Sequence, residues 1–156
     1  MAYEIERKFL VVNQSYRENA EGVLYKQAYL NSSSDRIVRI RIIGQKGYIT
    51  IKGPSEGCKR LEFEYEIPYS DAQIMFECLC EKPILEKYRY KVNINDLTWE
   101  VDEFMGENKG LIIAELELPN EKHSFTIPNW LGQEVTNDPK YYNSNLIKNP
   151  FIKWEK

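Results

Sequence analysis

The stretch Ala2-Tyr3-Glu4-Ile5-Glu6-Arg7-Lys8-Phe9-Leu10-Val11-Val12 is the most informative part of this 156-residue sequence. Successive side chains of a β-strand point to opposite faces, so Glu4, Glu6 and Lys8 share one face and most apolar residues share the other. Two carboxylates about 7 Å apart along a strand can reach one hard cation, and the lysine can hold an anion beside it. By itself, the stretch would also suit an edge strand with one face in water.

The same alternation recurs along most of the chain, with charge on one parity and apolar residues on the other. The predicted strands are residues 2–12, 24–31, 36–43, 47–53, 59–67, 84–92, 97–104 and 111–118. Seven cations lie on the charged faces of these predicted strands. They are Lys8, Arg39, Arg41, Lys52, Arg60, Lys87 and Arg89. The same faces carry eight carboxylates, which are Glu4, Glu6, Glu62, Glu64, Glu100, Asp102, Glu115 and Glu117. In residues 24–31 the polar face is the weakest.

Two segments have helical rather than strand periodicity. Ser70 and Gln73 have the spacing of a capping box before a predicted helix over 71–82, with a buried apolar stripe. After Pro119 the period of two stops, and the remainder is expected to be helices and loops. Asp138 is the expected N-cap of a helix that runs to about Lys148.

These elements favour a closed barrel over an open sheet. An open sheet would need several helices or a second sheet to cover its apolar face, and only two or three helices are available. Closing eight antiparallel strands removes the edges and leaves an interior for side chains or one small ligand. We therefore predict one mainly β domain over residues 1–156, a closed eight-stranded antiparallel β-barrel. Its lumen would be charged and hydrated, its exterior apolar and partly covered by the helices, and its ligand charged.

The composition excludes several classes of partner. The formal net charge is −3, from 21 basic and 24 acidic residues, so there is no overall attraction to nucleic acid or an anionic membrane. No leader or membrane-length apolar run is evident, and we expect a cytoplasmic protein. Cys58, Cys78 and Cys80 lack the partners of a zinc site and are expected to be reduced thiols. His123 is expected at the surface.

Short motifs in chain order resemble those of the CYTH, or triphosphate tunnel metalloenzyme, family. They are Glu4-Ile5-Glu6-Arg7-Lys8, Gln27-Ala28-Tyr29-Leu30, Arg39-Ile40-Arg41, Thr50-Ile51-Lys52, Arg60-Leu61-Glu62-Phe63-Glu64, Glu86-Lys87-Tyr88-Arg89-Tyr90, Glu100-Val101-Asp102, Glu115-Leu116-Glu117, Gly132-Gln133-Glu134-Val135-Thr136 and Asp138-Pro139-Lys140-Tyr141-Tyr142-Asn143. The sequence departs from the family pattern at Lys140, where the pattern has arginine.

The resemblance implies hydrolysis or cyclisation of a triphosphate compound with Mg²⁺ or Mn²⁺. The cations expected to bind the triphosphate are Lys8, Arg39, Arg41, Lys52, Arg60, Lys87 and Arg89. The residues expected to hold metal are Glu4, Glu6, Glu115 and Glu117, with Asp102 in support. The predicted catalytic residues are Glu62, Glu64 and Lys87. The two glutamates would hold a second metal or orient the attacking water, and the general base stays open.

Several functions remain open at this point. Eight strands and their covering helices leave little chain for a base or thiamine pocket, which favours inorganic triphosphate as the substrate. Within the family, thiamine triphosphatase and class IV adenylate cyclase are the rivals, and Tyr29, Tyr48 or Tyr88 could stack on an organic group. A binding module without turnover is the rival outside it, disfavoured because all three Glu-x-Glu pairs are present. The partner is a small-molecule triphosphate, and a homodimer stays open.

Overall fold

In a computed structural model that describes residues 3–155, the chain forms nine strands, two α-helices and four short 3₁₀ turns. Each predicted strand is present with its ends within two residues of the expected ones, although Ala2 lies outside the described residues. The strands are β1 (Tyr3–Val11), β2 (Val23–Asn31), β3 (Ile37–Ile43), β4 (Lys46–Lys52), β5 (Lys59–Ile67), β6 (Leu85–Ile94), β7 (Leu97–Phe104), β8 (Ile112–Glu117) and β9 (Leu131–Glu134). The helices are α1 (Tyr69–Cys78) and α2 (Asn143–Lys148).

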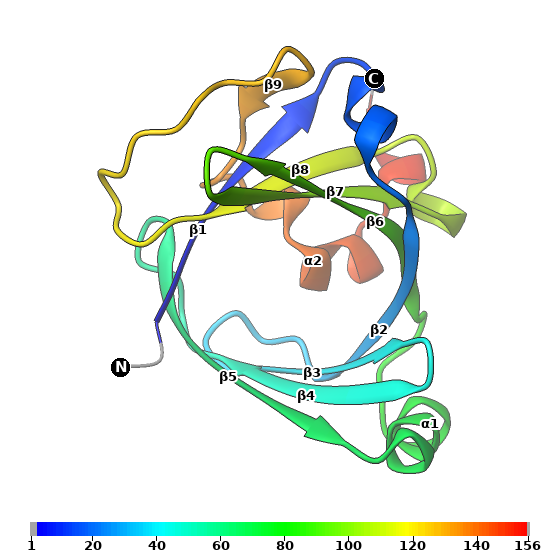
Figure 1. Ribbon diagram of the computed structural model, residues 1–156. Helices are drawn as coiled ribbons and strands as arrows, with labels where there is room; N and C mark the ends of the chain where they lie inside the picture. The colour runs from blue at the N-terminus through cyan, green and yellow to red at the C-terminus, as the bar shows by residue number, and fades with distance from the viewer. Residues whose placement is uncertain (1–2, 156) are drawn as a thin grey trace.

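Strand β1 closes the barrel because it pairs with both ends of an otherwise open sheet. The antiparallel order is β5-β4-β3-β2-β6-β7-β8-β1, and a further pairing joins β5 back to β1 (Figure 1). The first part of β1 pairs with β5, with Tyr3 opposite Leu61, and residues 6–10 pair with β8. The prediction of a closed eight-stranded antiparallel barrel is confirmed.

The ninth strand, β9, corrects the expectation that only helices and loops follow Pro119. Beyond residue 5, the edge of β1 that faces β5 has no β5 partner and pairs with β9 instead, with Phe9 opposite Glu134. Arg7, the one charge on the apolar side of β1, forms an ion pair with Glu134, with 2.6 Å from Nη2 to Oε1. Four residues without alternating apolar character give no strand signal, so β9 depends on the free edge of β1.

Both helices differ from the prediction. Helix α1 begins at Tyr69 and ends at Cys78 rather than spanning 71–82, and the predicted capping box is not formed, because Pro68 occupies the N-cap. Asp138 does act as an N-cap, but of a 3₁₀ turn over Pro139–Tyr141. Extended backbone at Tyr142 separates that turn from α2, so the predicted single helix is two pieces.

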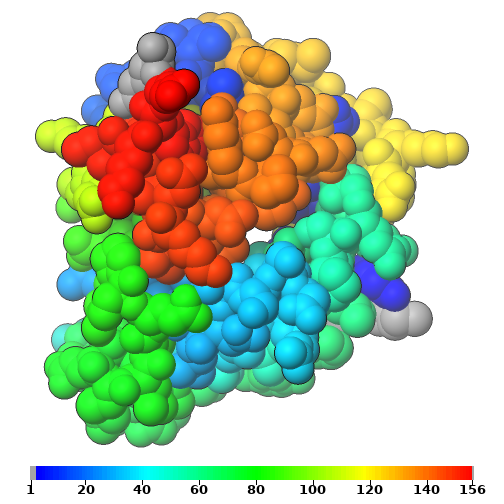
Figure 2. Space-filling model, turned by 180° about the vertical axis from the view of Figure 1, so that it is seen from behind, coloured from blue at the N-terminus to red at the C-terminus, as the bar shows by residue number. Residues whose placement is uncertain are grey.

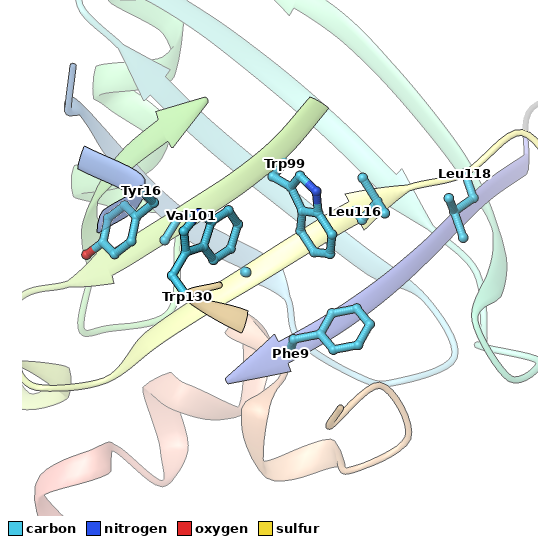
Figure 3. Close-up of a cluster of buried hydrophobic side chains, with 8 residues drawn as sticks. Phe9, Tyr16, Trp99, Val101, Leu116, Leu118 and Trp130 are labelled. Atoms are coloured by element: carbon cyan, nitrogen blue, oxygen red, sulfur yellow. The ribbon is translucent and has the colours of Figure 1, made fainter. Parts of the chain in front are cut away.

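The apolar exterior of the barrel is covered by the chain itself in two sectors. Over β1, β7 and β8, Phe9, Trp99 and Leu116 pack with Tyr16 and Trp130 from outside the barrel (Figure 3). Over β2 and β3, Ala72 and Phe76 of α1 pack on Ala28, Ile40 and Ile42. Of the predicted stripe Ala72, Met75, Phe76 and Leu79, the first three are in this cluster, whereas Leu79 is exposed because it lies past the end of α1. Burial of these large side chains stabilises the closed barrel.

Helix α2 occupies a different place from the one predicted. It was expected on the exterior, but Leu146 and Ile147 pack with Tyr29, Ile37 and other side chains from the inward parity of the strands. Seen from behind, the C-terminal segment lies across this end of the barrel (Figure 2). The lumen therefore has an apolar layer at the end closed by α2 and a charged layer beyond it.

The remaining predictions concern single residues. Cys58, Cys78 and Cys80 are all free thiols, and His123 is exposed, as expected. Among residues 3–155, no helix has the length and apolar character needed to cross a membrane.

Candidate functional site

The charged parity of the strands points into the barrel, where it lines a cavity of about 250 Å³. Every predicted site residue except Asp102 lines this cavity. These are Glu4, Glu6, Lys8, Arg39, Arg41, Lys52, Arg60, Glu62, Glu64, Lys87, Arg89, Glu115 and Glu117. Residues spread over more than a hundred positions thus meet in one place because alternate side chains of strands β1 to β8 face the axis.

Four of the glutamates form an acidic wall, which we define as Glu4 and Glu6 of β1 with Glu115 and Glu117 of β8. The two strands are neighbours, and Glu6 is directly opposite Glu117. Glu4 forms an ion pair with Lys52 at 3.4 Å, and Glu115 forms one with Lys8 at 3.2 Å. Within residues 3–155, neither Glu6 nor Glu117 has a cationic ion-pair partner. The wall therefore holds more negative charge than the cations in contact with it can balance.

The pKa values of the acidic wall reflect this imbalance. Burial, only partly offset by Lys52, raises the pKa of Glu4 to about 7. Burial and the neighbouring Glu115 and Glu4 raise the pKa of Glu6 well above its usual value. Burial and Glu4 also raise the pKa of Glu117. The pKa of Glu115 moves the other way, because Lys8 and other neighbours outweigh its burial.

The acidic wall has side chains of the kind that bind a divalent cation, but they are not yet arranged around a common metal position. Across residues 3–155, no three His, Cys, Asp or Glu side chains already surround a common metal position. Carboxylate oxygens are hard donors of the kind that Mg²⁺ and Mn²⁺ prefer. A cation here would supply the positive charge that the raised pKa values show to be lacking. The residues fit a divalent metal, provided that the glutamate side chains turn toward it.

Positive charge, opposite in sign to that of the acidic wall, gathers on β3. Two arginines there have hydrogen-bond donors available for a ligand. Arg39 donates from Nη2 to Thr50 Oγ1 at 3.2 Å, while its buried Nε has no hydrogen-bond partner in the described part of the chain. Among residues 3–155, Arg41 donates only to the neutral Oε1 of Gln27, at 3.3 and 3.4 Å. Burial and the nearby Arg39 lower the pKa of Arg41 to about 10. These guanidinium groups are suited to an anion entering the lumen.

Asp102 differs from the acidic wall because two cations already surround it. Its carboxylate accepts from Arg89 at 2.7 and 2.8 Å, and Lys87 Nζ lies 2.7 Å away. Asp102 is fully buried and does not line the cavity. Burial would raise the pKa of Asp102, but the two cations outweigh it and lower the pKa. Asp102 thus positions Lys87 and Arg89 from the side away from the cavity.

Lys87 connects this ion-pair cluster to the closed end of the lumen. Its Nζ donates to Asn143 Oδ1 at 2.8 Å, and Gln27 donates to the same oxygen at 3.1 Å. Burial lowers the pKa of Lys87 to about 7, although Asp102 acts in the opposite direction. The first residue of α2 therefore forms part of the floor of the cavity and contacts a side chain able to hold or release a proton near neutral pH.

The profile of the CYTH domain matches residues 2–147. The chain belongs to the CYTH family. An inorganic triphosphatase of Acetivibrio thermocellus is 55% identical over 151 residues, which cover 97% of each chain. An inorganic triphosphatase of Nitrosomonas europaea is 34% identical over 147 residues, covering 92% of this chain and 95% of the other.

Solved structures show the same CYTH architecture. A crystal structure of an inorganic triphosphatase superposes with a TM-score of 0.66 at 31% identity, covering 92% of this chain and 96% of that chain. A Bacillus halodurans protein described as an adenylate cyclase superposes with a TM-score of 0.64 over 79% of this chain and 85% of that chain. At 18% identity, that second likeness extends to the fold alone.

The CYTH domain also brings into the cavity residues to which the sequence analysis gave no role in the site, although some of them belong to the quoted motifs. Among them are Tyr142, Asn143 and Ser144, and Gln27 joins them through hydrogen bonds. Gln27 and Tyr29 lie on the inward face of β2. The alternation of side chains along the strand could therefore have predicted their place in the cavity, although the polar pattern of this strand is weak. Asn143 carried no such signal because it begins a helix that was expected outside.

Other named candidates lie elsewhere. Of the three tyrosines considered for stacking, Tyr29 lines the cavity, whereas Tyr48 and Tyr88 are not among its lining residues. Lys140, the departure from the family pattern, does not line the cavity either. Its Nζ lies 4.6 Å from the ring centre of Trp154, so it packs the C-terminal segment rather than reaching a phosphate from this position.

Proposed function

We propose that this protein hydrolyses inorganic triphosphate to pyrophosphate and phosphate within the barrel. The observation that carries the proposal is a single lumen with an acidic wall and facing arginines, in a chain 55% identical to an inorganic triphosphatase. Phosphoryl transfer depends mainly on positioning and on neutralising charge, which these two groups would supply together. We further propose that the chain acts as one domain, because strands β1 to β8 all contribute to this one lumen.

The size and closure of the lumen support an inorganic substrate. The cavity of about 250 Å³ lies below the roughly 300–1,000 Å³ of pockets for drug-sized organic ligands. Asn143 and the apolar layer around Leu146 fill the end where a base or a thiazolium ring would otherwise extend. A nucleoside or thiamine group would therefore have to remain outside the open mouth, with only the phosphate chain inside.

The cations of the lumen would hold the triphosphate. Arg39 and Arg41 offer forked donors, and Lys8 and Lys52 offer point charges beside the acidic wall. Arg60 lies near the open mouth, where its guanidinium contacts Ser55. Arg89 keeps its charge, since Asp102 and two glutamates outweigh burial and raise its pKa. The complete predicted set is Lys8, Arg39, Arg41, Lys52, Arg60, Lys87 and Arg89.

CYTH triphosphatases are metal-dependent. We assign Glu4, Glu6, Glu115 and Glu117 to Mg²⁺ or Mn²⁺, because this wall is short of positive charge. When bound, the ion would neutralise charge on the phosphate oxygens. Asp102, predicted from the sequence to support the metal, is assigned here to positioning Lys87 and Arg89.

Three side chains are assigned to the chemical step. Glu64, which accepts a hydrogen bond of 2.8 Å from Thr50 Oγ1, and Glu62 would orient the water that attacks phosphorus. Burial would raise the pKa of Glu62, but its hydrogen bond with Glu4 and the charge of Lys52 outweigh burial and lower the pKa, so Glu62 stays an ionised acceptor. As the phosphoanhydride bond breaks, Lys87 Nζ would give a proton to the leaving oxygen, a role suited to its pKa of about 7.

The test is a comparison of kcat/KM for tripolyphosphate, ATP and thiamine triphosphate, each with Mg²⁺ and with Mn²⁺, with the products identified. We expect equal amounts of pyrophosphate and phosphate from tripolyphosphate, and values for the organic substrates lower by about 100-fold or more. Cyclic AMP as the main product, or a preference for thiamine triphosphate, would overturn the proposal. Tight binding of tripolyphosphate without turnover would instead support a binding module.

A further inference from the structure

Gln27 is a buried polar side chain between the arginines of β3 and the floor of the cavity. It lies on the inward face of β2, and the β2–β3 pairing places it directly opposite Arg41. Its exposed fraction is 0%, and it is not among the residues that line the cavity. An amide is costly to bury unless its nitrogen and oxygen find hydrogen-bond partners. The partners of Gln27 therefore indicate what this side chain does.

The amide of Gln27 uses both of its ends. Its Oε1 accepts from Nε and Nη2 of Arg41, at 3.4 and 3.3 Å. Its Nε2 donates to the hydroxyl of Tyr29 and to Asn143 Oδ1, both at 3.1 Å. The lone pairs of the carbonyl and the hydrogens of the amide nitrogen are then all in use. Gln27 thus connects a cation of the anion site to the first residue of α2.

The charged side chains at the two ends fix the direction of these hydrogen bonds. Arginine only donates, so Arg41 requires the oxygen of Gln27 rather than its nitrogen. Lysine also only donates, so Lys87 Nζ, 2.8 Å away, requires Oδ1 of Asn143. Because that Oδ1 is an acceptor, Gln27 has to present Nε2 to it. Position 27 therefore needs a side chain that accepts on one side and donates on the other, as an amide does and an ionised carboxylate does not.

The neutrality of Gln27 also leaves the charge of Arg41 available to a ligand. Among residues 3–155, Arg41 donates to no carboxylate. Its Cζ lies 5.1 Å from the ring centre of Tyr25, and the same ring centre lies 4.8 Å from Cζ of Arg89. An amide oxygen and an aromatic ring orient a guanidinium without cancelling its charge. Nη1 of Arg41, which Gln27 does not use, can then donate to an anion in the cavity that Arg41 lines.

We propose that Gln27 is a positioning residue for triphosphate hydrolysis, which orients Arg41 toward the triphosphate and, through Asn143, orients Lys87. The inference rests on the proposed function, where Arg41 is assigned to the triphosphate and Lys87 to the leaving oxygen. A carboxylate at position 27 would pair with Arg41 and place an oxygen against Asn143 Oδ1. It would therefore impair the site although it keeps the shape of glutamine.

The test compares Gln27→Glu and Gln27→Met with the wild type. Gln27→Met keeps the length of the side chain and removes the amide. Binding of tripolyphosphate is measured by calorimetry in excess chelator, and kcat and KM are measured with Mg²⁺. Gln27→Met should raise the dissociation constant by about 10-fold, as expected when a hydrogen bond to a charged group is lost. Gln27→Glu should raise it at least as much, because Arg41 then has to leave a carboxylate. Unchanged binding in Gln27→Glu, or no binding to the wild type, overturns the proposal.

Double variants separate positioning from a merely structural role. If Gln27 acts on the anion through Arg41, adding Gln27→Met to Arg41→Ala should weaken binding by less than about 2-fold more, because the group that it orients is already absent. If Gln27 acts on Lys87 through Asn143, adding Gln27→Met to Asn143→Ala should lower kcat by less than about 2-fold more. Losses that add up fully in either pair overturn the proposal, since a side chain that only packs the wall would act independently of both partners.

Gln73→Glu is the matched control. Gln73 also donates from Nε2 to a tyrosine hydroxyl at 3.1 Å, that of Tyr69, but it is exposed on α1 outside the barrel. This control changes the net charge as Gln27→Glu does and should keep wild-type binding and kinetics, whereas an equal loss in both variants overturns the proposal. Thermal unfolding is recorded for each variant, and Gln27→Leu replaces Gln27→Met if the latter does not fold. A wild type that binds tripolyphosphate without hydrolysing it would contradict the proposed function, while the binding comparison would still test Gln27.

Discussion

The acidic wall and Asp102 lie in the same barrel and were predicted from the same alternation, yet their surroundings are opposite. Glu6 and Glu117 of the wall have no cationic ion-pair partner among residues 3–155, and their pKa values are raised by burial and by other carboxylates. Asp102 forms ion pairs with Lys87 and Arg89, and these two cations lower its pKa. A carboxylate on the inward face of a strand can thus either lack a cationic partner or serve as the counter-ion of one, and its neighbours determine which.

The largest expected effect comes from the paired carboxylate. Asp102→Asn leaves two buried cations with reduced compensation, and breaking a buried ion pair in this way costs about 3–5 kcal/mol. We expect the free energy of unfolding, measured by urea denaturation, to fall by an amount of this order. An unchanged unfolding midpoint would show that Asp102 is not the counter-ion of Lys87 and Arg89.

The acidic wall should respond in the opposite way. Glu4→Gln and Glu117→Gln each remove a negative charge that is already unfavourable, so stability without metal should hold or rise. Both variants should lose about 100-fold or more in kcat/KM, or about 2.7 kcal/mol of transition-state stabilisation. The check is steady-state kinetics beside thermal unfolding with and without Mn²⁺. Undiminished turnover in both, or turnover in excess chelator, would remove these residues from the metal site.

The sequence predicts which side chains face the lumen, but it does not predict which of them are in contact across the barrel. Alternation along each strand was enough to place Glu4, Arg39 and their neighbours in one closed lumen, because strand parity fixes the side on which a residue lies. Parity does not report distances across the barrel, so it could not separate Asp102 from the metal-site candidates. Nor could it place Asn143, which reaches Lys87 through the packing of α2 in the lumen.

The acidic wall should also make the metal-free protein sensitive to pH. The folded-state pKa of Glu4 is raised from 4.5 to about 7, so the stability it contributes is fully present below pH 4.5 and is lost as pH rises through about 7. Glu6 and Glu117 act in the same direction, whereas Lys87, whose folded-state pKa is lowered to about 7, acts in the opposite direction above about pH 7.

In chelator, the free energy of unfolding should therefore fall between about pH 5 and pH 8, by about 2 kcal/mol if Glu4 contributes most of its shift. Adding Mn²⁺ at pH 8 should reverse the fall, and Glu4→Gln should flatten the pH dependence. A metal-free protein with a flat profile across this window would contradict the charge imbalance inferred for the wall.

The smallest expected effect on stability concerns Arg41, a buried lumen cation for which no carboxylate partner is found among the described ion pairs. Its pKa is lowered to about 10 by burial and by Arg39, so the folded protein gains little from its charge. Arg41→Ala should change the free energy of unfolding by less than about 1 kcal/mol, typical of a site outside strong pairs. The rise in melting temperature caused by tripolyphosphate should nevertheless shrink. An equal rise in wild type and variant would exclude Arg41 from the anion site.

The location of the metal tests the account most directly. Crystals grown with Mn²⁺ and tripolyphosphate would give an anomalous difference map in which the ion is identified by its own scattering. We predict a peak bounded by the carboxylates of Glu4, Glu6, Glu115 and Glu117, with Asp102 still held by Lys87 and Arg89. A peak coordinated by Asp102, or an acidic wall without manganese while triphosphate occupies the lumen, would contradict it.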